Sequence, residues 1–184
     1  MNNMFRINRE EAALVLIDFQ ERLMPAMADK EILEDKVCRM VQGAKALNLP
    51  IILTQQYTKG LGPTIASIRD IIGDAEYIEK NTFSAYLEEN FKSAVKNTNK
   101  KTILLAGIET HICVEQTALD LVTAGYDVVL ISDCTQSRDS TNKEIAIRRM
   151  TNSGVGVTSY ESALYEMLVG SKAEEFKAIS NIVK

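Results

Sequence analysis

The sequence predicts an α/β domain built on a parallel sheet, and three observations lead to this fold class. Apolar runs of strand length alternate along the chain with stretches whose apolar residues follow helical spacing. The runs are continuously apolar, as in strands buried on both faces. Strands that alternate with helices form βαβ units, and such units build a parallel sheet with helices on both of its faces.

Each expected strand is a short apolar run, rich in β-branched residues, that ends at polar or turn-forming residues. In chain order these runs are residues 12–17, 51–54, 77–79, 102–106, 128–132 and 155–158. The first runs into Asp18, the third delivers Lys80, and the fifth leads to Asp133. A carboxylate at the carboxyl end of such a buried strand faces the edge where open α/β sheets bind ligands, so Asp18 is a candidate for a site, the alternative being that it caps the segment that follows.

The expected helices carry one apolar stripe each and have recognisable ends. In chain order they are residues 31–49, 65–72, 84–95, 114–124, 143–153 and 159–169. Pro50 ends the first, Gly125 follows the fourth, and Ser140 or Thr141 caps the fifth, while Ser159 caps the sixth. Ile32 and Leu87 are assigned to the buried sides of their helices.

The two remaining segments are a loop and a tail. Residues 55–63 are rich in turn-forming residues and are expected to form a loop. The tail, residues 176–183, keeps an apolar stripe that must be buried, and a neighbouring subunit is one way to bury it. We therefore expect a homo-oligomer.

Composition limits the classes of function. With 184 residues, of which 46% are hydrophobic, the chain suits one domain spanning residues 1–184. A formal net charge of −4 gives no attraction for nucleic acids or anionic membranes, and neither is an expected partner. No apolar run is long enough to span a membrane, and residues 1–10 lack the apolar core of a signal peptide, so we expect a cytoplasmic protein. Three cysteines fit reduced thiols better than disulfides.

Cys113 is the candidate nucleophile. It follows the strand 102–106 and falls near the first turn of the helix that begins at Val114. Unpaired N–H groups and the helix dipole at such a position stabilise a thiolate and lower the pKa of a cysteine. The alternative is that Cys113 is a small buried hydrophobe, as we expect for Cys38 and Cys134.

Four segments in order carry a family resemblance over most of the chain. Asp18 ends the first strand, and Lys80 opens the segment KNTFSA. The segment GIETHICV at residues 107–114 is followed by Thr117, Ala118, Gly125 and Tyr126, and the strand that leads to Asp133 is followed by Ser137 and Arg138. Together these segments resemble the isochorismatase-like cysteine hydrolases, the superfamily that includes nicotinamidases and N-carbamoylsarcosine amidohydrolases.

The resemblance implies a fold, a triad and a reaction. The fold would be a three-layer Rossmann-like one, with six parallel strands in the order 3-2-1-4-5-6. Asp18 would act as general base, Lys80 would hold the aspartate and the thiolate in register, and Cys113 would attack a carbonyl carbon to form a thioester. A cis peptide bond between Ile108 and Glu109 would turn the N–H of Glu109 beside that of Cys113, and the two N–H groups would form an oxyanion hole.

The expected substrate is a small amide or carbamoyl compound whose C–N bond is cleaved. Side chains beside the motifs are expected to line its pocket, namely Gln20, Gln55, Tyr57 and Phe83. His111, two residues before Cys113, is a further residue that could touch substrate. Because it is the one histidine of the chain, no cluster of imidazole ligands can form within a subunit, and we expect neither a metal nor another cofactor.

Three other readings stay open at this stage. Isochorismatase itself cleaves a vinyl ether, and family members with that chemistry can dispense with the thiol. The chain could instead be a binding or assembly scaffold in which Asp18, Lys80 and Cys113 are relics. A nicotinamide-dependent oxidoreductase is disfavoured, because no G-x-G-x-x-G follows the first strand, where VLIDFQERL stands.

Overall fold

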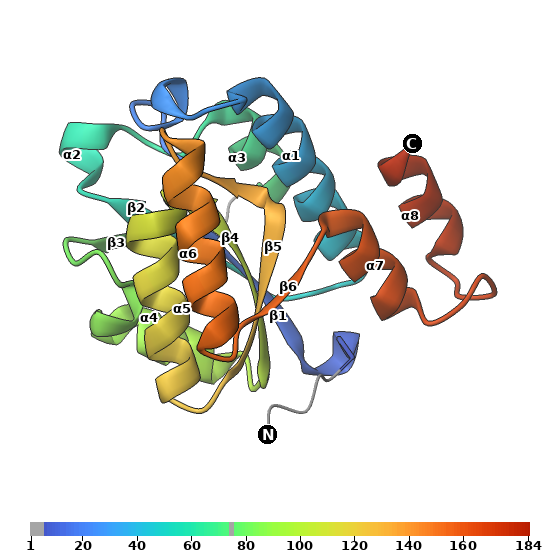
Figure 1. Ribbon diagram of the computed structural model, residues 1–184. Helices are drawn as coiled ribbons and strands as arrows, with labels where there is room; N and C mark the ends of the chain where they lie inside the picture. The colour runs from blue at the N-terminus through green and yellow to red at the C-terminus, as the bar shows by residue number, and fades with distance from the viewer. Residues whose placement is uncertain (1–5, 74–75) are drawn as a thin grey trace.

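The computed structural model describes residues 6–73 and 76–184. Residues 1–5, which belong to the segment expected to lack a signal-peptide core, and residues 74–75 lie outside the described residues. The described residues form one sheet of six parallel strands in the order β3-β2-β1-β4-β5-β6, which confirms the predicted fold class and strand order (Figure 1). The strands are Ala12–Ile17 (β1), Ile51–Gln56 (β2), Tyr77–Lys80 (β3), Thr102–Ile108 (β4), Asp127–Gln136 (β5) and Gly156–Thr158 (β6).

Helices cover both faces of this sheet (Figure 1). They are Lys30–Ala46 (α1), Thr58–Leu61 (α2), Ala66–Ile72 (α3), Glu89–Asn97 (α4), Glu115–Thr123 (α5), Ser140–Asn152 (α6), Tyr160–Leu168 (α7) and Phe176–Val183 (α8). Short 3-10 turns occupy Arg9–Glu11, Met24–Ala26 and Ala85–Leu87, and a π-helical turn occupies Thr110–Val114.

Two apolar cores result from the alternation of side chains along the central strands. In β1, Leu14 and Leu16 face α1, α3, α7 and α8, whereas Val15 and Ile17 face α4, α5 and α6. All four side chains are fully buried, because the strand is covered on both faces. The layers hold the carboxyl ends of the strands at one edge, where the polar residues lie.

The first helix differs from its prediction at its end and on its buried side. It ends at Ala46, because Asn48 adopts a left-handed conformation and closes the helix with backbone bonds from Asn48 to Lys45 and from Leu49 to Ala44. Pro50 lies outside this closure and begins the approach to β2. Ile32 was wrongly assigned to the buried side: its exposed fraction is 60%, while that of the adjacent Leu33 is 3%.

Two further boundaries were predicted wrongly. The helix expected at residues 84–95 is divided into a 3-10 turn and α4, and Leu87 in the turn is 59% exposed instead of inward. The cap of α6 is Asp139, whose carboxylate accepts a hydrogen bond from the Thr141 N–H at 2.8 Å, so that Ser140 and Thr141 are the first residues of the helix. Ser159 caps α7 as predicted.

The loop expected at residues 55–63 begins two residues later than predicted. β2 continues through Gln56, and the short helix α2 lies within the remainder of the segment. Two polar residues predicted as loop are therefore held in a strand next to β3.

The fifth strand is longer than predicted because its pairing with β4 shifts. Leu105 pairs with Leu130, but Gly107 pairs with Thr135, so β5 carries extra residues and still continues to Gln136. Asp133 consequently lies within the strand and not at its end. Its carboxylate accepts hydrogen bonds from Lys36 Nζ at 3.2 Å and from the backbone N–H at the start of α7 at 2.9 Å.

The C-terminal helix α8 packs against α1 and α7 of its own chain. Ile179 is fully buried, and Arg39 donates a hydrogen bond to the carbonyl of Ile182 at 2.7 Å. The apolar stripe of the tail thus packs against its own chain, with Ile179 buried and Phe176, Ile182 and Val183 partly buried. In the part of the chain described here, no helix combines the length and apolar character needed to cross a membrane.

Candidate functional site

The polar site begins where β1 and β4 end side by side. Ile17 pairs with Gly107 in the register of the two parallel strands, so Asp18 and the residues after Gly107 leave the sheet together. The two strands lie where the strand order reverses, which is the crevice in which α/β sheets bind ligands. Asp18 has a positive φ of 56°, a conformation that aspartate tolerates because its side chain is short and polar.

A buried ion pair joins the ends of β1 and β3. Lys80 Nζ lies 2.7 Å from Asp18 Oδ2, and both side chains are fully excluded from solvent. Burying two charges costs several kcal/mol per ion unless each is paired and hydrogen-bonded. A pair with so little access to water is therefore a candidate for function.

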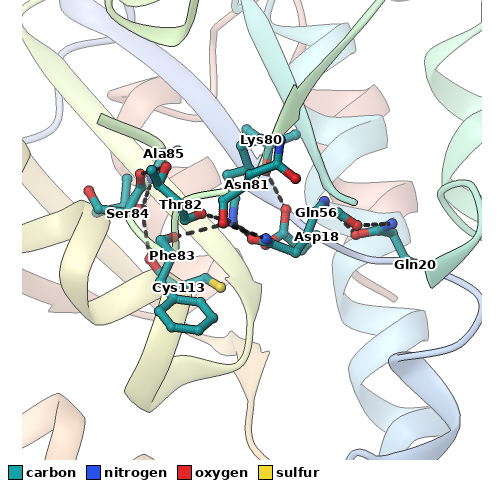
Figure 2. A network of polar contacts seen from close by, with 12 residues as sticks. Asp18, Gln20, Gln56, Lys80, Asn81, Thr82, Phe83, Ser84, Ala85 and Cys113 are labelled. Atoms are coloured by element: carbon teal, nitrogen blue, oxygen red, sulfur yellow. Dashed lines mark hydrogen bonds and ion pairs between the residues drawn. The ribbon is translucent and has the colours of Figure 1, made fainter. Parts of the chain in front are cut away.

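The two charges have well-defined further partners, as Figure 2 shows. Thr54, in the second half of β2, donates its hydroxyl to Asp18 Oδ1 at 2.7 Å. The Lys80 ammonium donates to Gln56 Oε1 at 2.6 Å and to the carbonyls of Thr82 and Phe83, each at 3.2 Å. These acceptors keep the ammonium at one place beside the aspartate.

One oxygen of the aspartate retains capacity for a proton. Asp18 Oδ2 is buried and accepts no hydrogen bond of ordinary geometry from any described residue. Lys80 Nζ, at 2.7 Å, is close enough to stabilise this oxygen as an ion pair. Such an oxygen can accept a proton from a neighbouring acid.

Cys113 lies beside this pair, in the π-helical turn that leads into α5 (Figure 2). Its side chain is buried, with an exposed fraction of 8%. Burial and the negative charge of Asp18 raise the pKa of Cys113 to about 12, while Lys80 acts in the opposite direction. The expectation that the helix turn would lower this pKa is therefore wrong, because the thiol is buried and lies beside the Asp18 carboxylate.

Buried hydroxyl groups fix the turn that carries Cys113. The peptide bond between Ile108 and Glu109 is cis, at the position implied by the resemblance. Thr135 donates to the carbonyl of Gly107 at 2.7 Å, and the hydroxyls of Thr110 and Thr135 lie 2.9 Å apart. Because the one proton of the Thr135 hydroxyl is used at Gly107, Thr110 is the donor in the second bond.

Two polar pairs flank the same turn. Arg138 donates its Nε to both carboxylate oxygens of Glu109 at 3.1 Å, and its backbone N–H donates to Oε2 at 3.0 Å. His111 Nδ1 lies 2.9 Å from the hydroxyl of Ser137. The segment with Ser137 and Arg138 is thus in contact with the cysteine turn.

The four residues expected to bind substrate divide into two kinds. Gln20 is fully buried and its amide bonds to backbone groups of Gln56 and Gly62, while Gln55 bonds to the hydroxyls of Thr64 and Thr58. These two glutamines brace the loop after β2. Tyr57 and Phe83 are 52% and 57% exposed, so their rings are free to meet a ligand. Contact of any of the four with a substrate stays a prediction.

Sequence reasoning did not identify Thr54 and Gln56, which complete the polar cluster. They stand two residues apart at the end of an apolar strand, so their side chains point to the same face. Two polar residues at this spacing, in the strand that pairs with the one before Asp18, are the signal that could have identified them. Among the described residues, no group of three or more His, Cys, Asp or Glu side chains is arranged to hold a metal ion.

Two surface hollows lie away from these residues. One, of about 420 Å³, lies between α1 and α8, and the other, of about 310 Å³, lies between residues 21–34 and 65–66. Neither is lined by Asp18, Lys80 or Cys113. The candidate site is therefore defined by the buried ion pair and the thiol that lies beside it. The size of a surface hollow does not identify it.

Comparison with known proteins gives consistent matches. The model of the isochorismatase domain matches residues 12–162. Isochorismatase domain-containing protein 1 from Salmo salar is 36% identical over 167 residues, which cover 91% of this chain and 59% of that protein, so the chain spans well under two thirds of that relative.

Two solved structures share the fold over nearly the whole chain. The YcaC gene product from Escherichia coli, described as an octameric hydrolase of unknown specificity, has a TM-score of 0.93 at 26% identity and covers 99% of this chain and 91% of its own. YcaC from Pseudomonas aeruginosa, solved with hexane-2,5-diol and covalent acrylamide, has a TM-score of 0.92 at 27% identity, with 98% and 92% covered.

Proposed function

The chain belongs to the isochorismatase family, and we propose that it is a cysteine hydrolase that cleaves a C–N bond of a small amide or carbamoyl compound. The observation that carries the proposal is the buried pair of Lys80 and Asp18 beside the Cys113 thiol, with Asp18 Oδ2 short of a hydrogen-bond donor. A charged carboxylate next to a protonated thiol is the arrangement that general-base activation requires.

In the first half of the proposed reaction, the Cys113 thiol passes its proton to Asp18 as sulfur forms a bond to the carbonyl carbon. The carbonyl oxygen gains the negative charge and is held by the N–H groups of Glu109 and Cys113. The C–N bond then breaks, and Asp18 returns the proton to the departing nitrogen. The products of this half are a free amine or ammonia and a thioester on Cys113.

In the second half, Asp18 takes a proton from a water molecule, whose oxygen attacks the thioester carbon. The C–S bond breaks, the carboxylic or carbamic acid is released, and the proton held by Asp18 returns to sulfur. Lys80 keeps its charge throughout, and it stabilises the thiolate and the aspartate whenever either is negative.

A structural relative supports the choice of a nucleophilic mechanism. YcaC from Pseudomonas aeruginosa carries covalent acrylamide, a small electrophilic amide that adds to nucleophiles. This chain has the same fold and a buried thiol beside an aspartate and a lysine, which supports a nucleophilic role for Cys113.

The test is hydrolysis of a panel of small amides and carbamoyl compounds, followed by release of ammonia or amine. We expect Cys113→Ser and Asp18→Asn to lower the rate by at least about 10³-fold, as loss of a nucleophile or its base does in other enzymes. Cys38→Ser is the matched control, because Cys38 lies on α1 outside the site, and it should retain activity. An acyl adduct on Cys113, seen by intact mass, would support the thioester.

Two results would overturn this proposal. Hydrolysis that survives Cys113→Ser at the wild-type rate would leave no role for the thiol and would favour the vinyl ether chemistry. If no compound of the panel reacts and Cys113 is no more reactive than Cys38, the chain would instead be a scaffold with relict residues.

We also propose that the chain folds as one domain and assembles into a homo-oligomer. The continuous sheet from β3 to β6 supports the single domain. The octameric state of YcaC from Escherichia coli supports the assembly. Light scattering coupled to gel filtration would give the subunit number, and a purely monomeric protein would contradict the second proposal.

A further inference from the structure

A single buried hydroxyl on α5 connects the two halves of the candidate site. Thr117 donates its hydroxyl to the carbonyl oxygen of Cys113 at 2.6 Å, and the hydroxyl oxygen of Thr117 accepts a hydrogen bond from the N–H of Ala85 at 2.9 Å. Thr117 and Ala85 are both fully buried. The Thr117 hydroxyl is therefore a donor to the backbone of Cys113 and an acceptor from the backbone of Ala85, which lies in a different loop.

That loop, residues 81–88, is the one that holds the Lys80 ammonium. The carbonyls of Thr82 and Phe83 accept hydrogen bonds from Lys80 Nζ, so their positions set where the ammonium lies (Figure 2). The Glu88 carboxylate closes the loop, because its Oε1 accepts hydrogen bonds from the N–H groups of Asn81 and Thr82 and from the Thr82 hydroxyl. The loop is thus a defined structure, held by its own hydrogen bonds.

A second bond fastens the same loop to α5. The Ser84 hydroxyl donates to Asp120 Oδ2 at 2.6 Å. Asp120 stands three residues after Thr117, on the same side of the helix. Neighbouring residues of the loop, Ser84 and Ala85, therefore contact one face of the helix that begins at the cysteine turn.

We infer that Thr117 is a positioning residue that sets the Cys113 turn against the loop that holds Lys80. This inference rests on the proposed function, since it treats Cys113 as the nucleophile. The path runs from the Cys113 carbonyl through the Thr117 hydroxyl to Ala85, and from the loop carbonyls to Lys80 and Asp18. A shift of the loop would move the carbonyls that hold the Lys80 ammonium, and so would move the ammonium relative to Asp18 and the thiol.

The test compares two substitutions that separate the hydroxyl from the space it fills. Thr117→Val keeps the volume and loses both hydrogen bonds, whereas Thr117→Ser keeps the hydroxyl and loses a methyl group. Thr123→Val is the matched control, because the Thr123 hydroxyl makes the same bond to the carbonyl four residues earlier on α5, at 2.8 Å, but is exposed and lies at the far end of the helix.

The readout is the rate of acrylamide addition to Cys113 across a range of pH, followed by peptide mass spectrometry. We expect Thr117→Val to lower the rate near neutral pH by about 10- to 100-fold, the effect of a misplacement of about 1 Å on a reacting group. Thr117→Ser should restore most of the rate, and Thr123→Val should match the wild type. If Thr117 has a merely structural role, Thr117→Val would lower the melting temperature, but the folded variant would add acrylamide at the wild-type rate at every pH. That result would overturn the inference.

A measurement on the wild-type protein covers the case in which Thr117→Val does not fold. The Ala85 N–H should exchange with solvent deuterium as slowly as amides of the central strands, because its bond to Thr117 is buried. Rapid exchange of this amide would contradict the inference. Failure of the proposed function is distinguishable, because it would appear as amide hydrolysis that persists in Cys113→Ser, whatever the effect of Thr117 on alkylation.

Discussion

Replacing Asp18 by asparagine should make Cys113 more acidic while it abolishes hydrolysis. In the wild-type protein, burial and the Asp18 charge raise the pKa of Cys113 to about 12, against the pull of Lys80. The Asp18→Asn variant keeps the shape and burial of the site and also keeps the Lys80 ammonium. It removes the negative charge that opposes a second negative charge on sulfur.

The magnitude follows from the effect of one adjacent charge. A charge next to a titrating group moves its pKa by about 1 to 3, or about 1.4 to 4 kcal/mol. We therefore expect the pKa of Cys113 to fall to about 9 to 11 in the variant. At pH 9 the thiolate fraction would rise from about one in a thousand to between about one in a hundred and one in two.

The assay is the ultraviolet absorbance of the thiolate, measured as the difference between each protein and the same protein with Cys113→Ser. Wild type should show almost no Cys113 thiolate through the mildly alkaline range, and Asp18→Asn should show a clear rise. Asp127→Asn is the matched control, because Asp127 begins β5 at the opposite edge of the sheet, and it should titrate like the wild type. If the variant keeps the wild-type titration, Asp18 does not act on the thiol, and its assignment as general base is refuted.

Three further substitutions test the site and its supports. Lys80→Met should lower the free energy of unfolding by about 3 to 5 kcal/mol, because Asp18 is left buried without its partner, and adding Asp18→Asn should recover much of the loss in denaturant titrations. Gly107→Ala would place a Cβ 2.4 Å from Ile17 Cβ and 2.8 Å from Ile17 O, and calorimetry should show a destabilised protein, by about 1 to 3 kcal/mol, that has also lost activity. Hydrogen bonds from the backbone N–H groups of Asn81 and Thr82 lower the pKa of Glu88. The Glu88 carboxylate therefore contributes stability that is present above its ordinary pKa and is lost as the pH falls through the lowered pKa. The difference in melting temperature between wild type and Glu88→Gln should vanish in acid, and a difference that does not depend on pH would contradict this.

The sheet could be predicted from the sequence because its strands are buried on both faces. A strand such as β1 leaves an unbroken apolar run, and the βαβ alternation then restricts the topology. Helix ends were less accessible. Asn48 ends α1 through a left-handed conformation, and the sequence drew attention instead to the proline two residues later.

The sequence was enough to identify the residues of the candidate site, but not the direction in which the pKa of Cys113 is shifted. Asp18 and Cys113 were identified through position after strands and through resemblance, Lys80 through resemblance alone, and the three side chains lie together. The direction of the Cys113 pKa was predicted wrongly, because a sequence shows the helix turn but not the burial of the thiol or its approach to Asp18. Thr54 and Thr117 were not given roles, since a hydroxyl has no sequence signature for the loop or strand it will contact.

The strand order explains why a lysine, and not a shorter basic group, completes the ion pair. β3 and β1 are separated by β2, so their backbones lie about 10 Å apart, two strand spacings. Lys80 crosses this distance with its four-carbon stem, and Asp18 completes the span at 2.7 Å. The crossing passes over the end of β2, where Thr54 and Gln56 hydrogen-bond to Asp18 and Lys80 respectively. Four adjacent strands, from β3 to β4, thus lead into one polar cluster, and moving any one of them in the sheet would remove a contact that the proposed chemistry needs.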